Sequence, residues 1–263
     1  MSYSVNYACI SNIGKLRSIN QDNFICNGTY ADIGGADIRS PLVGSVSAKD
    51  SVLFGIFDGM GGEQCGEIAS YIAAKEAGDF SFEQDSVKAL NDFCLKANRS
   101  ICDYAQDNLV SSMGTTAAMI LFSKKIITIC NIGDSRIFRF SKGELDQISK
   151  DHVVMAQFGT KPPLSQNLGI PESFMIIEPY LSQGRYRNGD KYLICSDGLT
   201  DMLPENQISD IISKGNVLEA AESLVEMSLS KGGKDNITVI LLEVKSSINR
   251  LFFKDRSNGG NRL

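Results

Sequence analysis

The sequence has 263 residues, of which 43% are hydrophobic, 26 are Lys or Arg and 31 are Asp or Glu, so its formal net charge is −5. This apolar content is enough to build a folded core, which argues against a disordered chain. The negative balance provides no broad basic surface for nucleic acid or an anionic membrane, and it favours a protein or a small molecule as the partner.

The first half of the chain predicts strands followed by a helix pair. Strand-like segments lie around residues 3–10 and 23–27, and the apolar run SVLFGIF then reaches Asp58 within DGMGG. A helix is predicted from Glu63 to Ala77. A second is predicted from Ser86 to Leu109, because apolar side chains recur there at helical spacing.

The second half returns to strands before another helix pair. TTAAMILF, KIITICNI and SRIFRF predict a meander with turns at 124–125 and 133–134, and a Pro-containing irregular stretch follows. KYLICS predicts a strand, and NITVILLEV predicts the last one. Between them, PENQISDIISKG predicts a helix with Pro204 near its first turn and Gly215 past its end, and NVLEAAESLVEMSLSKGG predicts another.

This order of elements lacks a regular βαβ alternation. It therefore favours an α+β fold in which antiparallel sheets carry helix pairs on their outer faces. No internal repeat or linker divides the chain, so residues 1–245 are expected to form one domain. Residues 246–263 are expected to form a tail that frays, apart from possible docking by Leu251 to Phe253.

Cysteine and histidine usage excludes several chemistries. The seven cysteines include no CxxC pair and mostly lie in apolar runs, as reduced core thiols would. A single histidine, His152, rules out a zinc site built on several histidines, and neither a GxSxG elbow nor a Walker loop occurs. With no leader pattern and no apolar run of membrane-spanning length, a cytoplasmic location is expected.

Five short Asp-containing turns carry the functional information: SINQDNF, IFDGMGG, NIGDSR, CSDGL and KDNITV. Each turn taken singly is more often structural, because Asp and Asn in turns bond their own backbone. Taken together, they would gather carboxylates that repel one another unless cations neutralise them. Hard ions such as Mg²⁺ and Mn²⁺ prefer such oxygen ligands, so the turns predict metal-assisted chemistry on a phosphate.

The ordered set RSINQDNF, FDGMGG, MGTTAA, NIGDSR, KDH, SDGL and KDNITV resembles the metal-dependent protein phosphatases, the phosphatase 2C family, in its compact bacterial form. The resemblance covers nearly all of residues 5–244. It implies a central β-sandwich flanked by helix pairs. It also implies hydrolysis of phosphoserine or phosphothreonine by a hydroxide that two Mn²⁺ or Mg²⁺ ions activate, with no protein nucleophile.

The resemblance also assigns roles to residues. Asp58 would bridge two metal ions, Gly59 would offer its carbonyl, and Asp22 would contact the cluster through water. Arg17 would bind the substrate phosphate, which suits the planar guanidinium fork. The remaining metal ligands would be Asp197 and Asp235 for one of the ions and Asp134 for a weaker third ion.

The chain departs from the family pattern at several positions. Gln21 stands where many relatives carry glutamate, and Met60 replaces the histidine of the DGHGG form, which removes one candidate general acid. His152 is interpreted as structural, as are residues 113–116, and Gly61 and Gly62 as serving backbone geometry. The flap after KDH is expected to be abbreviated, with Gly159 as a pivot and no acid for a third ion before Leu164.

Two other functions fit the sequence less well. A catalytically silent phosphoprotein-binding module with the same fold would be expected to lack metal ligands, whereas Asp58, Asp197 and Asp235 are all present. A calcium-stabilised structural protein is disfavoured because no D-x-D-x-D-G loop occurs. The expected partners are phosphorylated proteins and a cognate Ser/Thr kinase, with no nucleic acid and no membrane, and the chain is expected to be a monomer.

Overall fold

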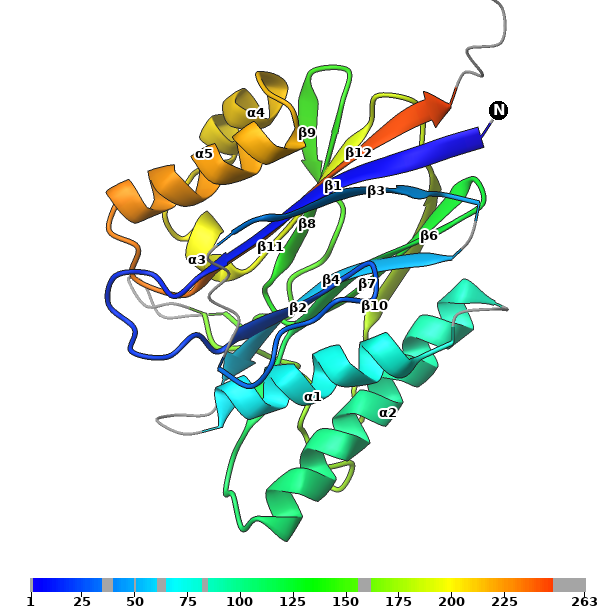
Figure 1. Ribbon diagram of the computed structural model, residues 1–263. Coiled ribbons are helices and arrows are strands. Elements are labelled where there is room, and N and C mark those ends of the chain that lie inside the picture. Colours follow the sequence, from blue (N-terminus) through cyan, green and yellow to red (C-terminus); the bar gives the residue numbers. More distant parts are fainter. Residues whose placement is uncertain are drawn as a thin grey trace, which may run out of the picture.

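The computed structural model describes residues 2–34, 40–49, 51–60, 65–81, 85–155 and 162–247. Two antiparallel sheets pack face to face, and a helix pair covers the outer face of each (Figure 1). The four layers confirm the predicted α+β sandwich. No helix within the described ranges is both long enough and apolar enough to cross a membrane.

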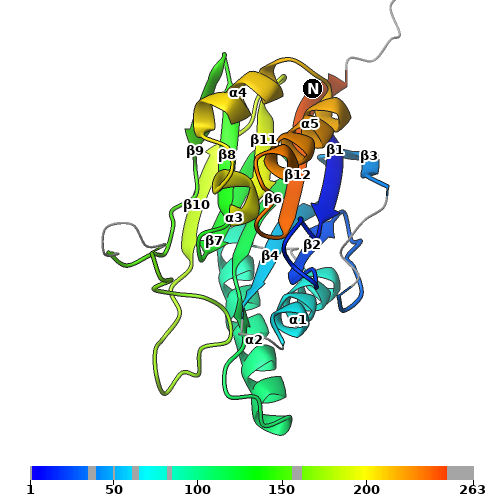
Figure 2. The ribbon, with the colours of Figure 1, turned by 90° about the vertical axis from the view of Figure 1, so that its left-hand side faces the viewer.

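The first sheet has the strand order β3-β1-β12-β11-β8-β9. Its strands are β1 (Ser2–Asn12), β3 (Leu42–Ser47), β8 (Arg136–Ser141), β9 (Glu144–Gln147), β11 (Lys191–Cys195) and β12 (Ile237–Ser247). The helices on its outer side are α4 (Glu205–Ser213) and α5 (Val217–Ser230), and the short α3 (Asp197–Thr200) follows β11. In the view turned by 90°, α3 lies below α4 (Figure 2).

The second sheet has the strand order β10-β7-β6-β4-β2, with the short β5 paired to β4. Its strands are β2 (Asp22–Cys26), β4 (Val52–Met60), β5 (Gly114–Thr115), β6 (Ala117–Ser123), β7 (Ile126–Ile132) and β10 (Tyr180–Arg185). The helices that cover it are α1 (Gly66–Asp79) and α2 (Ser86–Asp107).

Three apolar layers hold the sandwich together, and strand alternation explains them. Successive residues of a strand point to opposite faces, so Ile194 packs between the sheets while Leu193 packs under α4 and α5. In the same way Ile56 faces the layer between the sheets and Phe57 faces α1 and α2. Each of these four side chains is at most 1% exposed, so the strand ends emerge from a rigid core.

The predicted meander is wrong at its third strand. β6 and β7 form a hairpin as expected, but β8 pairs with β11 and β9 in the opposite sheet. The turn at 133–134 therefore carries the chain from one sheet to the other. The strands β3, β9 and β10 were not predicted. All three are edge strands with exposed positions, so they carry no continuous apolar run.

Element ends differ slightly from the predictions. Pro204 is the N-cap of α4, which confirms its predicted place near the first turn. α1 continues to Asp79, whereas its predicted start at Glu63 lies outside the described residues. β12 pairs with β1 as far as Ser247, two residues into the expected tail, and residues 248–263, with the segment expected to dock, are not described.

Candidate metal centre

Asp58 lies near the end of β4, and two threonines hold its backbone. The Asp58 amide donates to Thr116 Oγ1 at 3.0 Å, and the Asp58 carbonyl accepts from the Thr116 amide at 2.9 Å. Thr115 Oγ1 donates to the same carbonyl at 3.0 Å. These contacts support the interpretation that the two threonines position the strand. They leave the Asp58 side chain on a preorganised backbone.

Asp22 lies directly opposite Asp58 in the register of β2 and β4. Its side chain is buried, and one of its oxygens, Oδ2, accepts hydrogen bonds from Ser196 Oγ at 2.8 Å and Thr238 Oγ1 at 2.6 Å. The pKa of Asp22 is raised to about 6, chiefly by burial and to a smaller extent by the charge of Asp235, although the two hydroxyls and Arg17 act in the opposite direction. A buried acid held in this way resists ionisation unless a cation joins it.

Asp197 and Asp235 come from the other sheet. Asp197 is the first residue of α3, directly after β11, and its side chain is buried. A Cβ on Gly198 would lie 2.0 Å from the Asn236 carbonyl oxygen, so this glycine lets the two segments meet. The Asn236 side chain accepts from the Gln21 amide at 2.8 Å, which ties the same segments to the turn that precedes β2.

Arg17 reaches the same group of acids. Its Nη2 lies 2.6 Å from Asp235 Oδ2, and the two side chains are 49% and 30% exposed. The guanidinium therefore points into the site and remains accessible from solvent. Its partner here is a carboxylate, so the structure places Arg17 where an incoming anion could compete with Asp235 for it.

Gly59 is closely surrounded by backbone. Its amide donates to the Gln21 carbonyl at 3.1 Å, and a Cβ at this position would lie 2.1 Å from the Gly66 carbonyl oxygen. Any larger residue would push β4 away from the start of α1. The Gln21 side chain donates to Glu67 Oε2 at 3.1 Å, so it anchors an acid in the first turn of α1 that the sequence analysis did not consider.

The turn that carries Asp134 is fixed by its neighbours. The His152 amide donates to the Gly133 carbonyl at 2.9 Å, and the Gly133 amide donates to His152 Nδ1 at 3.3 Å. Ser135 Oγ lies 2.7 Å from Thr116 Oγ1, which links this turn to the backbone of Asp58. His152 thus has the structural role that was expected. Burial lowers its pKa, so the ring is neutral at pH 7.

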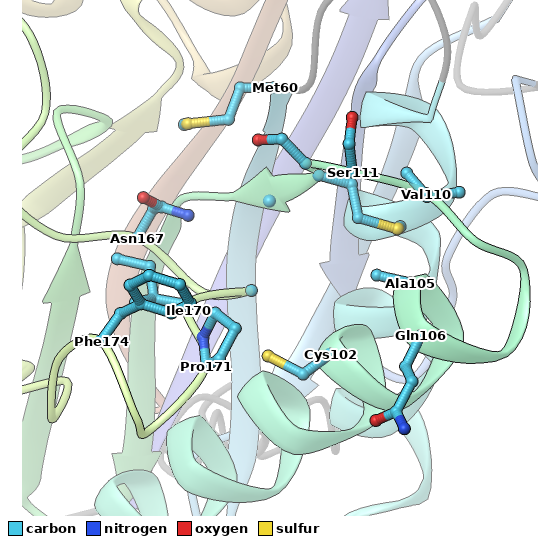
Figure 3. Close-up of a pocket in the computed structure, with 14 residues that line it drawn as sticks. Met60, Cys102, Ala105, Gln106, Val110, Ser111, Asn167, Ile170, Pro171 and Phe174 are labelled. Atoms are coloured by element: carbon cyan, nitrogen blue, oxygen red, sulfur yellow. The ribbon is translucent and has the colours of Figure 1, made fainter.

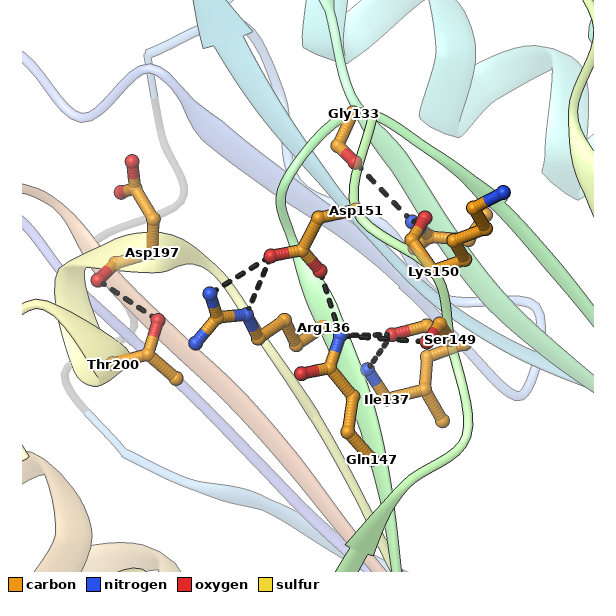
Figure 4. A network of polar contacts seen from close by, with 10 residues as sticks. Gly133, Arg136, Ile137, Gln147, Ser149, Lys150, Asp151, Asp197 and Thr200 are labelled. Carbon is orange, nitrogen blue, oxygen red and sulfur yellow. Dashed lines mark hydrogen bonds and ion pairs between the residues drawn. The ribbon is translucent and has the colours of Figure 1, made fainter. Parts of the chain in front are cut away.

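An ion pair between Arg136 and Asp151, which was not predicted from the sequence, lies at the start of β8. Arg136 binds Asp151 Oδ2 through Nε at 2.9 Å and Nη2 at 2.8 Å, and Gln147 Nε2 donates to the other oxygen of Asp151 at 2.7 Å (Figure 4). The last residue of NIGDSR is thus joined to the middle residue of KDH. The two motifs were available in the sequence, but the pairing between them was not.

The oxygen donors fit a hard divalent cation by type. Asp22, Asp58, Asp197 and Asp235 supply carboxylates from both sheets, and Gly59 supplies a backbone carbonyl, which is the ligand class that Mg²⁺ and Mn²⁺ prefer. Among the described residues, no three His, Cys, Asp or Glu side chains are arranged to enclose an ion by themselves. The observation that carries the fit is the placement of Asp22 opposite Asp58, together with a raised pKa of Asp22 that burial chiefly causes and to which the charge of Asp235 adds.

The segment after KDH folds back on itself. Val153 and Leu164 form an antiparallel bridge, and the Ser165 amide donates to the His152 carbonyl at 2.9 Å. Residues 156–161, with the expected pivot Gly159, are not described, and neither are Gly61 and Gly62. The abbreviated flap therefore stays a prediction that the pairing of its two ends supports.

Comparison with known families supports this arrangement. A model of the protein phosphatase 2C family matches residues 42–231. The chain is 33% identical over 206 residues to the serine/threonine protein phosphatase PstP of Mycobacterium tuberculosis, covering 73% of this chain and 40% of PstP. It therefore spans less than half the length of that relative. It is 29% identical over 208 residues to the serine/threonine phosphatase stp of Listeria welshimeri, covering 72% of this chain and 82% of that protein.

Solved structures agree. The crystal structure of the Mycobacterium tuberculosis phosphatase PstP/Ppp superposes with a TM-score of 0.76 at 26% identity, covering 92% of this chain and 100% of that chain. The PstP catalytic domain in complex with two manganese ions superposes with a TM-score of 0.75 at 28% identity, covering 93% of this chain and 100% of that one.

Proposed function

The chain belongs to the protein phosphatase 2C family, and we propose that it is a metal-dependent phosphatase that hydrolyses phosphoserine and phosphothreonine in proteins. The observation that carries the proposal is that Asp22, opposite Asp58 in one sheet, is hydrogen-bonded to Ser196 and Thr238 of the other sheet. These two residues lie beside Asp197 and Asp235 in the sequence, and the Arg17 guanidinium binds Asp235. On this proposal residues 1–245 form the catalytic domain.

We assign the residues of the site as follows. Asp58 bridges two Mn²⁺ or Mg²⁺ ions, with Gly59 contributing its carbonyl and Asp197 and Asp235 completing one ion. Asp22 contacts the metal pair through water, and the hydroxyls of Ser196 and Thr238 fix the orientation of its side chain. The metal pair, when bound, lowers the pKa of a water and offsets charge on the phosphoryl oxygens. Asp134 contributes to a weaker third ion.

Arg17 binds the phosphate. Its guanidinium pairs with Asp235, and both side chains are partly exposed, so the pair is weak and can be exchanged. When cations neutralise Asp235, the guanidinium becomes available to two phosphate oxygens, for which its planar fork is suited. Arg17 can therefore exchange its contact with Asp235 for a contact with the substrate phosphate without a large movement of the backbone.

The proton for the leaving alkoxide does not come from a histidine near the acids. The ring of His152 accepts from the backbone of Gly133, and the position within DGMGG where other members carry histidine is Met60. The proposed source is a water in the metal site.

The biological setting is also part of the proposal. All seven cysteines are free thiols, which suits a reducing compartment such as the cytoplasm. There the enzyme would act as a monomer on the products of a cognate Ser/Thr kinase.

The test is release of phosphate from a phosphothreonine peptide. Turnover should require Mn²⁺ or Mg²⁺, stop when the metal is chelated, and return when metal is added back. A folded protein that binds the phosphopeptide tightly but releases no phosphate with either metal would instead support the silent binding module.

A further inference from the structure

A groove of about 470 Å³ begins at Met60 and runs along the C-terminal half of α2 (Figure 3). Cys102, Ala105 and Val110 form one wall, and Ile170 and Phe174 are on the other. Fourteen described residues line the groove, and none of these carries a charged side chain. Its volume lies within the range of about 300–1,000 Å³ that is usual for ligand pockets.

The groove is built on fixed backbone. The buried side chain of Asn98 in α2 accepts from the amides of Gly169 and Ile170 at 2.7 and 3.0 Å, and it donates to the Ile170 carbonyl at 2.9 Å. The neighbouring residue Leu168 pairs with Thr115 through two backbone hydrogen bonds of 3.0 and 2.9 Å. The segment that carries Ile170 is therefore bonded to α2, which forms the other wall, and to Thr115 of β5. The groove is thus preorganised for a ligand.

The groove is continuous with the candidate metal centre. Met60 follows Asp58 by two residues on β4, a separation of about 7 Å along a strand. Met60 also pairs with Gly114, which lines the groove. A peptide whose phosphate lies at Asp58 would reach the groove within two to four residues, because an extended chain covers about 3.3 Å per residue.

We propose that the groove binds an apolar side chain of the substrate protein, two to four residues from the phosphorylated residue. The enzyme then prefers phosphosites flanked by an apolar residue over sites flanked by a charged one. This inference rests on the proposed phosphatase function. A charged side chain would lose hydration in the groove without gaining a partner of opposite sign, whereas an apolar one would gain by leaving water.

The rim of the groove also suits a protein substrate. Phe174 is 84% exposed, and it lies at the edge of the groove beside the partly buried apolar residue Ile170. Large exposed apolar groups beside a cleft mark sites of contact with other proteins. The amides of Gln106 and Asn167 lie in the same groove and could accept or donate hydrogen bonds to the main chain of a bound peptide.

The first experiment compares phosphothreonine peptides that differ at a single position. Leu, Glu or Lys is placed two, three or four residues from the phosphothreonine on either side, and kcat/KM is measured with Mn²⁺. An aryl phosphate, which fills the phosphate site alone, is assayed in parallel. At one or more positions the Leu peptide should exceed the Glu and Lys peptides by about tenfold, as expected for one apolar side chain in a pocket.

The second experiment introduces a charge into the groove. Ser111 is exposed at its edge, so Ser111→Asp is not expected to disturb folding. Relative to aryl phosphate turnover, this variant should lose most of the Leu preference and should favour the Lys peptide over the Glu peptide. Ser213→Asp, an exposed site on α4 in the opposite layer, adds the same charge and should keep the wild-type order.

The outcomes separate the two hypotheses. Turnover of the aryl phosphate with equal kcat/KM for all peptides would overturn the groove assignment and leave the phosphatase function standing. The same peptide ranking in Ser111→Asp as in the wild type would also overturn it. Failure to hydrolyse both the aryl phosphate and every peptide, by a folded protein supplied with metal, would overturn the phosphatase function itself.

Discussion

Replacing Asp22 with Asn should stabilise the metal-free protein at neutral pH. Both hydrogen bonds to this side chain end on a single oxygen, so an asparagine can keep them with its carbonyl oxygen and turn its NH₂ to the other side. The substitution thus removes a buried charge and little else. Ordinarily the loss of a buried hydrogen-bonded acid is destabilising, so the sign of the effect is informative.

The magnitude follows from the pKa. Burial raises the pKa of Asp22 from 3.8 to about 6 in the folded protein. Above pH 6 the folded state must hold an ionised buried acid, whereas below pH 4 the acid is neutral in both states and contributes no penalty. Asp22 therefore costs stability increasingly as pH rises from 4 to 6. The penalty amounts to about 3 kcal/mol at pH 8 and about half as much at pH 5.

The assay is urea unfolding followed by far-UV circular dichroism, because the chain has no tryptophan. With chelator present, Asp22→Asn should exceed the wild type by up to about 3 kcal/mol at pH 8, and the advantage should shrink at pH 5. The matched control is Asp103→Asn, which makes the same substitution at an exposed position of α2 and removes no buried charge. With Mn²⁺ the wild type should recover most of the difference, since binding to the folded state alone stabilises it.

Two results would refute this reasoning. One is an Asp22→Asn protein that is less stable than the wild type at both pH values, which would mean that the carboxylate makes favourable contacts that the amide cannot reproduce. The other is a constant difference between pH 5 and pH 8, which would mean that the acid does not titrate in this range.

Three further predictions test the site. Asp58→Asn should abolish Mn²⁺-dependent turnover and raise stability in chelator, and near-normal activity would disprove the bridging role. Arg17→Ala should lower kcat/KM for phosphopeptides by about 10²-fold or more while metal titration by calorimetry stays nearly unchanged, because the guanidinium contacts phosphate. Asp134→Ala should reduce turnover while metal analysis still finds two bound ions, and loss of that pair would contradict the third-ion assignment.

The positions of the strand-end acids could be predicted from the sequence. Asp58 and Asp197 each follow an apolar run that is buried on both faces of a sheet. Such runs can be recognised in a sequence from their composition alone. The helix pairs were equally accessible, because α2 repeats apolar residues at helical spacing. The elements that escaped prediction were the edge strands β3, β9 and β10 and the short α3, whose sequences carry neither signal.

The surroundings of the acids could not be predicted. Asp22 depends on hydroxyls 174 and 216 residues away in the sequence, and the Arg136 to Asp151 ion pair depends on how β8 enters the first sheet. The predicted meander would have put β8 beside β7 and separated this arginine from its partner. Local patterns specify which face of a strand is apolar, but they do not specify which sheet a hairpin joins.

The geometry of the candidate site is a property of the packing between the two sheets. Asp22 and Asp58 leave one sheet while Asp197 and Asp235 leave the regions around β11 and β12 in the other, so their mutual distances depend on the apolar layer that separates the sheets. Side-chain hydroxyl and amide groups cross that boundary near the acids, and three of them, those of Ser196, Thr238 and Asn236, bond to the segment that carries Asp22. These three bonds fix the orientation of the strand ends without a cation. The packing of the sandwich core therefore holds the acids together against their mutual repulsion, and metal binding removes that repulsion and stabilises the folded state.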